Sequence, residues 1–449
     1  MENIQEIKST KYLIRITIPV FIETLFAMLV GQIDQFMISS KTDTGFAALG
    51  NANQVINFLV LFLRVVSMAS TILISQYIGA NERNKLNKIY SLSVYFNVAL
   101  SAIISFILIV FGKSIHSALE CPTEIINDCV TYTKIIACGL VFEALLGVYS
   151  AFYKSNGYMK ECMYVIVIVN LLNIFGNAIF LYGFFGLPEL GVKGVAYSSV
   201  ISKFIGYLLA LALKRRFNIS TAIRHIIPFP YRILYKILSV GFPAMGESFA
   251  YSTAMIFVQK FVNRFGKLTV DARTAVNTVA FIAWIFSISI STTTQIVVGY
   301  LMGAREISSI KTRYKSSLKI AMALSFAGSI LLCIFGRQLC GIFIKSPEAL
   351  DLCQKILFID IFLEQGRAIN LVTVRTLQAC GDTKFPIFIG IIDTWVVAVV
   401  GGFVLSIVFN LGLVGIWIAL ASDEIFRGII YIIRFKTGKW ETFNLIDEK

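Results

Sequence analysis

Long apolar stretches follow one another along the whole chain, separated by short polar breaks. A helix needs about 20 apolar residues to cross the hydrocarbon core of a bilayer, and each stretch is about that long or longer. The pattern predicts an all-α integral membrane protein with about 12 transmembrane helices. The expected spans are 13–39, 51–78, 88–112, 126–153, 160–185, 194–214, 234–263, 275–302, 316–338, 350–379, 385–410 and 412–435.

The polar stretch 215–233 is the longest break inside the chain, and it divides the expected spans six and six. We therefore expect an N-terminal six-helix lobe at 1–214 and a cytoplasmic inter-lobe linker at 215–233. A C-terminal six-helix lobe at 234–449 would end in a short cytoplasmic tail.

The two halves repeat a set of Pro, Gly and acidic residues in nearly constant register, as in transporters built from two similar halves around a central site. Pro19, Glu23, Gly79-Ala80 and Gly157 recur 224 residues later as Pro243, Glu247, Gly303-Ala304 and Gly381, and Leu190-Gly191-x-x-Gly194 recurs 221 residues later as Leu411-Gly412-x-x-Gly415. Because each half contains an even number of spans, the two pseudo-symmetric copies have the same orientation in the membrane.

Most of the 40 Lys and Arg residues fall in alternate polar breaks. Cytoplasmic loops are enriched in Lys and Arg, so this distribution places both termini in the cytoplasm and implies an even number of spans. The net charge of +14 therefore reports topology and does not indicate nucleic-acid binding. Residues 1–12 are polar and lack the features of a signal peptide, so we expect the first span to be retained.

Composition excludes an ordinary soluble protein and gives no sign of an enzyme. Hydrophobic residues make up 57 % and charged residues 15 % of the chain, and the mean hydropathy is +0.77. The eight cysteines have no CxxC spacing, and the two histidines, His116 and His225, fall in predicted loops without an HExxH pattern. We expect no resident metal and no cofactor, apart from H⁺ or Na⁺ as a coupling ion.

Ionisable residues inside the expected spans point to a polar cavity, because a charge at the centre of a lipid-facing helix costs about 2.5–3.5 kcal/mol on insertion scales. Asp34 lies in the first span between Gln32 and Gln35, and its carboxylate could exchange a proton or bind Na⁺ as its access alternates. A structural carboxylate capped by neighbouring amides is the alternative. Asn173 and Asn177 lie one turn apart on one helical face, where they could offer amide oxygens to a cation or serve helix packing.

Further charged residues cluster in the second half. Glu364 and Arg367 are spaced to pair on one helical face, either inside a cavity or as a packing contact. Asp423, Glu424 and Arg427 have a similar spacing and are interpreted as structural charge pairs. Glu247 follows Pro243 by four residues and is a candidate proton or substrate carboxylate. The residues expected to line the substrate cavity are Glu23, Gln35, Glu143, Tyr251, Lys260, Glu364, Arg367, Asn370 and Asp393.

Several short segments in a specific order carry a family resemblance. They are Pro19 with Asp34 fifteen residues later, the stretch 76–80 with its echo at 301–304, Gly381-Asp382-Thr383, and 190–196. With the repeat of two times six spans, these segments resemble the multidrug and toxic compound extrusion (MATE) transporters. The segments 243–247, 364–370 and 423–427, with Trp440, resemble a bacterial branch of that family.

The resemblance implies two six-helix lobes that form a V-shaped cleft and export driven by H⁺ or Na⁺ entry. Asp34 matches the acidic residue of the first helix that family members use for coupling. The chain departs from some members at Asn177, where a second carboxylate often stands, and at Tyr251, where some have Glu.

The expected function is a secondary active exporter of organic or amphipathic small molecules that works by alternating access, as a functional monomer among the lipids of a bacterial cell membrane. A lipid-linked glycan flippase of the same superfamily is the alternative. A membrane-embedded enzyme is disfavoured because no nucleophile or metal constellation is present, and a channel because two repeated lobes suit rocking around one site.

Overall fold

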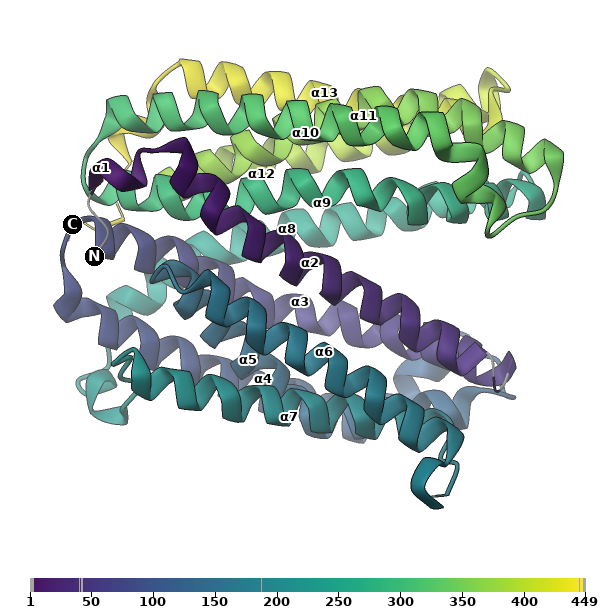
Figure 1. The fold of residues 1–449 in the computed structure, drawn as a ribbon, viewed down its shortest axis with the longest axis horizontal. Coiled ribbons are helices and arrows are strands. Elements are labelled where there is room, and N and C mark those ends of the chain that lie inside the picture. Colours follow the sequence, from purple (N-terminus) through teal and green to yellow (C-terminus); the bar gives the residue numbers. More distant parts are fainter. Residues whose placement is uncertain (1–3, 40, 42, 187, 444, 447–449) are drawn as a thin grey trace. The chain divides into compact units, whose positions relative to one another are not determined.

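The computed structural model describes residues 4–39, 41, 43–186, 188–443 and 445–446, and within them the chain consists of helices and connecting turns without a β-strand (Figure 1). The long helices are α2 (Thr10–Ser39), α3 (Asp43–Gly79), α4 (Leu86–Ala118), α5 (Ile126–Ser155), α6 (Met159–Tyr182), α7 (Val192–Arg216), α8 (Tyr231–Asn263), α9 (Lys267–Gly303), α10 (Ile307–Gly341), α11 (Pro347–Cys380), α12 (Lys384–Asp393) with its π-helical continuations at Thr394–Gly401 and Val404–Val408, and α13 (Gly412–Lys436). Short elements are α1 (Ile4–Ile7) and single turns at Arg83–Lys85, Phe184–Gly186, Ile223–Ile226 and Lys439–Thr442. The predicted all-α membrane fold is confirmed.

Nine helical stretches in the described residues are long and apolar enough to cross a membrane: α2 to α7, α9, α10 and Lys384–Val408. The other three long helices, α8, α11 and α13, carry ionisable residues in their middle turns, among them Glu247, Glu364 and Arg427. These helices are therefore the ones in which buried charge has to be stabilised by the protein itself.

Contacts divide the chain into two compact units. The C-terminal unit comprises the described parts of Met1–Phe21, Gly79–Asn81 and Phe242–Lys449, and the N-terminal unit comprises Ile22–Ile78 and Glu82–Gly241. The unit boundaries in α2 and α8 each fall within three residues of a proline, Pro19 or Pro243, and a further boundary falls at the last residue of α3. The lobe and linker boundaries expected near 214 and 234 stay a prediction.

The N-terminal segment is held within the C-terminal unit by polar contacts. Nη2 of Arg313 on α10 donates to the carbonyl of Ser9 at 2.8 Å, and Lys8 pairs with Glu306 at 3.0 Å. The hydrogen bond from Lys8 lowers the pKa of Glu306. On α2, Oγ1 of Thr17 lies 2.8 Å from Oγ1 of Thr293 on α9. The first turns of α2 thus pack with the helices of the second half.

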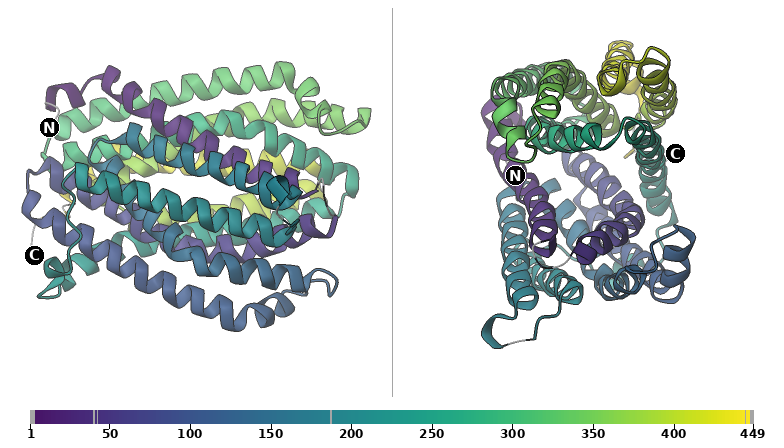
Figure 2. Two further views of the ribbon diagram at one scale, coloured as in Figure 1. Left: turned by 60° about the horizontal axis from the view of Figure 1, so that its bottom comes forward. Right: turned by 90° about the vertical axis from the view of Figure 1, so that its right-hand side faces the viewer.

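Within each unit the long helices run side by side around an apolar core (Figure 2). In the N-terminal unit the core includes Leu49 of α3, Leu140 of α5 and Val195 of α7, all buried. The corresponding core of the C-terminal unit includes Val276 of α9 and Ile356 of α11. Burial of aliphatic side chains between close-packed helices positions the polar residues described below.

The internal repeat predicted from the sequence is present in the backbone. Asn81 and Arg305 follow α3 and α9 with φ of 60° and 59°. The amide of the next residue then bonds back to the helix, from Glu82 to the carbonyl of Tyr77 at 3.0 Å and from Glu306 to that of Leu301 at 2.9 Å. Two glycine pairs also have matching positive φ: Gly157 and Gly381, at 88° and 97°, and Gly191 and Gly412, at 53° and 57°. The two units are therefore built on the same sequence of helix ends and turns.

Candidate functional site

In the N-terminal unit Asp34 on α2 meets the two asparagines of α6. Nδ2 of Asn177 donates to Oδ1 of Asp34 at 2.5 Å. In the orientation of the Asn173 amide that satisfies both of its atoms, Nδ2 donates to the same Oδ1 at 2.9 Å and the amide oxygen accepts from the backbone and hydroxyl of Ser199. The structure thus brings together three of the four residues predicted to form the coupling site.

One buried oxygen of this cluster accepts no hydrogen bond from the described residues. This atom is Oδ1 of Asn177. Carboxylate and amide oxygens are the ligands that hard cations prefer. A protonated carboxyl group donates a hydrogen bond, which an amide oxygen can accept. The carboxylate of Asp34 and the amide oxygen of Asn177 can therefore bind either a small cation or a proton.

A cavity of about 180 Å³ lies elsewhere in the same unit and contains two of the acids predicted for the substrate site, Glu23 and Glu143. Each of them is paired: Glu23 with Lys154 of α5 at 2.6 Å, and Glu143 with Lys203 of α7 at 2.6 Å. Arg64 of α3 also lines the cavity, and its side chain is exposed. Glu23 and Glu143 therefore do not present free negative charge there.

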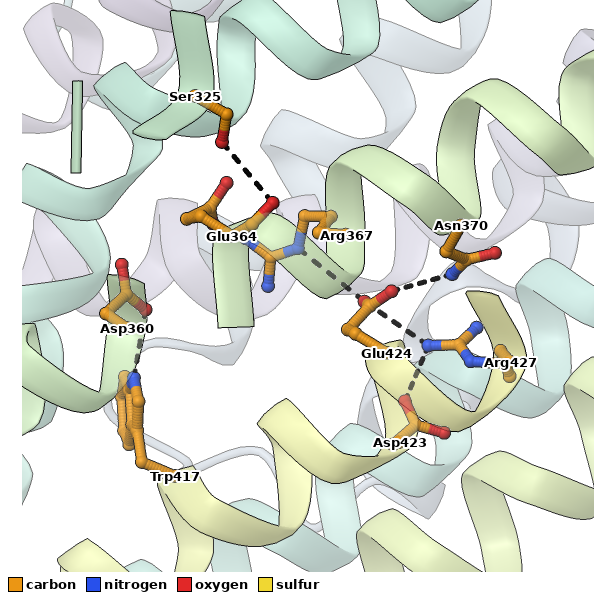
Figure 3. Close-up of polar contacts among 9 residues, drawn as sticks. All are labelled: Ser325, Asp360, Glu364, Arg367, Asn370, Trp417, Asp423, Glu424 and Arg427. Atoms are coloured by element: carbon orange, nitrogen blue, oxygen red, sulfur yellow. Dashed lines mark hydrogen bonds and ion pairs between the residues drawn. The ribbon is translucent and has the colours of Figure 1, made fainter. Parts of the chain in front are cut away.

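In the C-terminal unit a continuous ion-pair network joins α11 and α13 (Figure 3). Arg367 pairs with Glu364 one turn earlier and lies 3.6 Å from Oε1 of Glu424. Arg427 contacts the same Oε1 at 3.2 Å and Oδ2 of Asp423 at 2.5 Å. The sequence placed these residues in two separate groups, and Glu424 joins them.

Polar groups around the network complete it. Nδ2 of Asn370 donates to Oε2 of Glu424 at 2.6 Å. Nε1 of Trp417 donates to Oδ1 of Asp360 at 3.1 Å, as the left side of Figure 3 shows. Asp360 was not among the predicted site residues, although it lies one turn before Glu364 on the same face of α11.

Carboxylates outnumber guanidinium groups in this region. Asp393 of α12 contacts the carboxyl group of Asp423, and each of them has one buried oxygen that receives no hydrogen bond from any described residue. Glu247 of α8 has Arg375 and Arg427 as charged neighbours. Two buried carboxylates in contact repel each other unless a proton or a cation lies between them. The pair Asp393 and Asp423 is thus a second place that could take an ion.

The other three predicted cavity residues are Lys260, Tyr251 and Gln35, and Tyr251 has Arg367 and Glu424 of the ion-pair network as charged neighbours. Lys260 of α8 has an exposed side chain whose Nζ lies 5.3 Å from the centre of the Phe257 ring. Tyr251, also on α8, is exposed, and Gln35 of α2 is partly buried. Lys154 follows the expected span 126–153 and lies in the last turn of α5, where it pairs with Glu23.

These features define the class of protein: a polytopic helical membrane protein of two repeated units, each with buried ionisable groups that could bind an ion. The MatE family model matches the chain twice, at residues 19–179 and 243–404. The two matches begin at Pro19 and Pro243, the residues that open the repeat. The chain belongs to the MatE family of transporters, the family that the sequence resembles, and is not an enzyme.

Curated relatives and solved structures agree with this assignment. "Uncharacterized transporter YisQ" of Bacillus subtilis is 29 % identical over 430 residues, which cover 95 % of this chain and 94 % of that protein. "Probable multidrug resistance protein NorM" of Thermotoga maritima is 26 % identical over 98 % of this chain and 94 % of that protein. The same fold is found in a MOP superfamily transporter from Pyrococcus furiosus, with a TM-score of 0.90, 21 % identity and 99 % of each chain covered. The binding pocket of that transporter is described as having reverse polarity.

Proposed function

We propose that this protein exports organic or amphipathic small molecules from a bacterial cell by exchange for entering H⁺ or Na⁺, with access alternating between its two lobes. It works as a monomer in the cell membrane with both termini in the cytoplasm. Membership of the MatE family and the name of the multidrug resistance relative support an efflux role. A lipid-linked glycan flippase has less support, because neither the family match nor that relative favours it.

The observation that carries the coupling mechanism is the contact of Asp34 with Asn173 and Asn177. When Asp34 is ionised it accepts hydrogen bonds, and the amide nitrogens of both asparagines supply them. When Asp34 takes a proton it becomes a donor, and the oxygen of Asn177, which has no partner in the described part of the chain, can accept its hydrogen bond. The contact between α2 and α6 thus has two hydrogen-bond arrangements, and ion binding decides between them.

Na⁺ would act on the same atoms by a different route. A cation beside the carboxylate of Asp34 finds the amide oxygen of Asn177 as a further ligand, since both are hard oxygen donors. In either case the ion changes the relative stability of two states of the protein by its differential affinity for them. The pair Asp393 and Asp423 is the second candidate for coupling, because two contacting carboxylates need a proton or cation between them.

The charges of the N-terminal cavity leave the charge of the substrate open. Glu23 and Glu143 are each neutralised by a lysine, while Arg64 faces the same cavity. The pocket polarity of the Pyrococcus furiosus transporter, described as reversed, indicates that the fold itself does not set this preference. A screen should therefore contain both cationic and anionic amphipathic compounds.

The test is gradient-driven transport by the full chain in sealed proteoliposomes, with a pH gradient and a Na⁺ gradient imposed separately. We expect Asp34→Asn to abolish gradient-driven movement of substrate, while substrate binding and thermal unfolding stay near those of the wild type. Asp351→Asn is the matched control, since Asp351 forms an exposed pair with Arg337. Wild-type transport rates in Asp34→Asn would remove Asp34 from the mechanism, and loss only in Asp393→Asn or Asp423→Asn would move coupling to the C-terminal unit.

A further inference from the structure

His116, Cys121 and Cys129 form a buried cluster at the end of the α4–α5 hairpin. One ring nitrogen of His116 and the two sulfur atoms all lie within 4.8 Å of one another. All three side chains are buried, with exposed fractions of 1 %, 8 % and 0 %. The cluster could not be predicted from the sequence, because His-x4-Cys-x7-Cys is not a familiar metal-site spacing and His116 was expected in a loop. In the structure His116 lies in the last turn of α4.

Local backbone geometry brings the three residues together. After α4 ends at Ala118, Glu120 adopts a left-handed φ of 55°, and the amide of Cys121 bonds back to the carbonyl of His116 at 3.1 Å. This turn places Cys121 against the end of the helix it has just left. Helix α5 then begins at Ile126 and presents Cys129 from its first turn.

The distances fit metal ligation better than a disulfide. Sγ of Cys121 and Sγ of Cys129 are 3.6 Å apart. Two thiolates on a tetrahedral Zn²⁺, each about 2.3 Å from the metal, lie about 3.8 Å apart. A disulfide instead requires about 2.05 Å. The sulfur atoms therefore stand at nearly the separation that a shared metal ion imposes.

The histidine has the outer contact typical of a metal ligand. Oγ1 of Thr133, one turn after Cys129 on α5, lies 2.9 Å from Nε2 of His116, and both residues are buried. In the tautomer that donates from Nε2 to Thr133, Nδ1 carries the lone pair that a metal needs, and the hydrogen bond holds the ring in place. The exposed carboxylates of Glu120 and Glu124 and the partly buried carboxylate of Asp128 lie close to the turn in sequence and would attract a cation.

The second unit provides an internal comparison. Cys129 donates to the carbonyl of Ala48 at 3.5 Å, and Cys353 donates to that of Ala272 at 3.7 Å; in both cases the two residues are 81 positions apart. Cys340 occupies the repeat position of His116 and pairs with Cys353. At the repeat position of Cys121 stands Lys345. The third ligand is thus present only in the N-terminal unit, so the cluster there goes beyond what the repeat itself requires.

We propose that His116, Cys121 and Cys129 bind a thiophilic divalent metal ion, with Zn²⁺ as the representative, which joins the ends of α4 and α5 on the face that the charge distribution predicts to be external. Two thiolates and an imidazole form a set suited to Zn²⁺, and water supplies the fourth ligand. On binding, the two thiols release their protons to solvent. The ion clamps a hairpin whose connecting turn is exposed. This inference is independent of the transport cycle.

The experiment uses the full chain in detergent, with affinity tags removed, reduced and freed of metal, and titrated with Zn²⁺ against a chromophoric chelator. We expect one Zn²⁺ per chain, and at least a 100-fold loss of affinity in Cys121→Ser and in Cys129→Ser. Thr133→Val, which removes only the hydrogen bond to His116, should cost about 10- to 100-fold. The matched control Cys340→Ser/Cys353→Ser should bind Zn²⁺ as the wild type does.

A readout on the wild type guards against variants that fail to fold. Zn²⁺ should protect Cys121 and Cys129, but not Cys340 and Cys353, from alkylation when the modified cysteines are mapped by mass spectrometry. Co²⁺ in place of Zn²⁺ should give thiolate-to-metal charge-transfer absorption in the near ultraviolet. Absence of stoichiometric binding, equal loss in the control variant, or a Cys121–Cys129 disulfide in protein purified without reductant would each overturn the proposal.

Discussion

Oδ1 of Asp34 lies 2.5 Å from Nδ2 of Asn177, a residue 143 positions further along the chain. This hydrogen bond links α2 to α6. Its acceptor, the carboxylate of Asp34, becomes a donor when it gains a proton and a ligand when it binds a cation. A carboxylate held by an amide in this way is set in place before the ion arrives.

The first prediction concerns this amide. Asn177→Leu removes both the donor to Asp34 and the amide oxygen for which the described residues supply no hydrogen-bond partner. Loss of a hydrogen bond to a charged group costs about 1.5–3 kcal/mol, and here it destabilises the ionised form of Asp34, so the apparent affinity for H⁺ should rise about 10- to 100-fold. The apparent affinity for Na⁺ should instead fall, because the cation loses the amide oxygen as a ligand. The measurement is the dependence of transport rate on ion concentration in proteoliposomes.

Asn170→Leu is the control for that experiment. Asn170 lies two turns before Asn177 on α6, is also buried, and its Nδ2 has no partner among the described residues. An equal change of ion affinity in both variants would mean that α6 packing, and not the contact with Asp34, sets the affinity.

The second prediction concerns the buried network of the C-terminal unit. Arg427→Met leaves Asp423 and Glu424 without their nearest cation. Breaking a buried ion pair by removing one partner costs about 3–5 kcal/mol, because the remaining charge stays out of water. We expect a large drop in the midpoint of thermal unfolding in detergent, or failure to accumulate in the membrane.

Arg337→Met is the comparison for Arg427→Met. Arg337 also pairs with an aspartate, Asp351, but both side chains are more than half exposed. Exposed pairs contribute about 0–1 kcal/mol, so the unfolding midpoint should hardly move. Similar midpoints for the two arginine variants would show that the network does not stabilise the fold.

A third prediction follows from the contact of Asp393 with Asp423. Ordinary carboxyl groups lose their protons near about pH 4. If these two carboxyl groups share one proton in the folded protein, the folded state binds more protons than the unfolded state at pH values above that range. The free energy of unfolding then falls as pH rises. Asp393→Asn supplies an amide donor in place of the proton, so its stability should fall less steeply with pH than that of the wild type.

Unfolding midpoints measured without Na⁺ at several pH values test this. Adding Na⁺ at the highest pH should restore stability to the wild type if a cation can replace the proton, and should have a smaller effect on Asp393→Asn. Parallel pH profiles for the two proteins would show that no proton is shared at this contact.

Much of the fold could be predicted from the sequence, because the signals are local or periodic. Membrane-spanning helices need long apolar runs, and the repeat preserved the residues that its turns require, such as Gly157 and Gly381 with positive φ. The grouping of Asp34 with Asn173 and Asn177 was also accessible, since two asparagines one turn apart face one neighbour.

Contacts between distant side chains were less accessible. The position of Glu424 between Arg367 and Arg427 depends on the packing of α11 against α13, and sequence spacing describes only pairs within one helix. The expected span 126–153 ends just before Lys154, because a lysine usually marks the end of a span. In the structure α5 continues past Lys154, whose charge is paired with Glu23. The cluster of His116 with two cysteines depends on a tight turn after α4 that has no distinctive pattern.

The final prediction tests the packing role of the repeated glycines. A Cβ on Gly194 would lie 2.8 Å from the carbonyl oxygen of Phe180, and one on Gly415 would lie 2.7 Å from the carbonyl carbon of Leu405. Backbone atoms cannot move aside as a flexible side chain can, so each Gly→Ala change should destabilise its unit by about 1–3 kcal/mol. In Gly246→Ala, on α8, the new methyl group meets nothing within 4 Å, and alanine favours a helix over glycine by about 1 kcal/mol. Thermal unfolding in detergent should therefore rank the Gly246 variant at or above the wild type and both repeat variants below it, whereas unchanged midpoints for Gly194→Ala and Gly415→Ala would mean that the helices can separate to admit a methyl group.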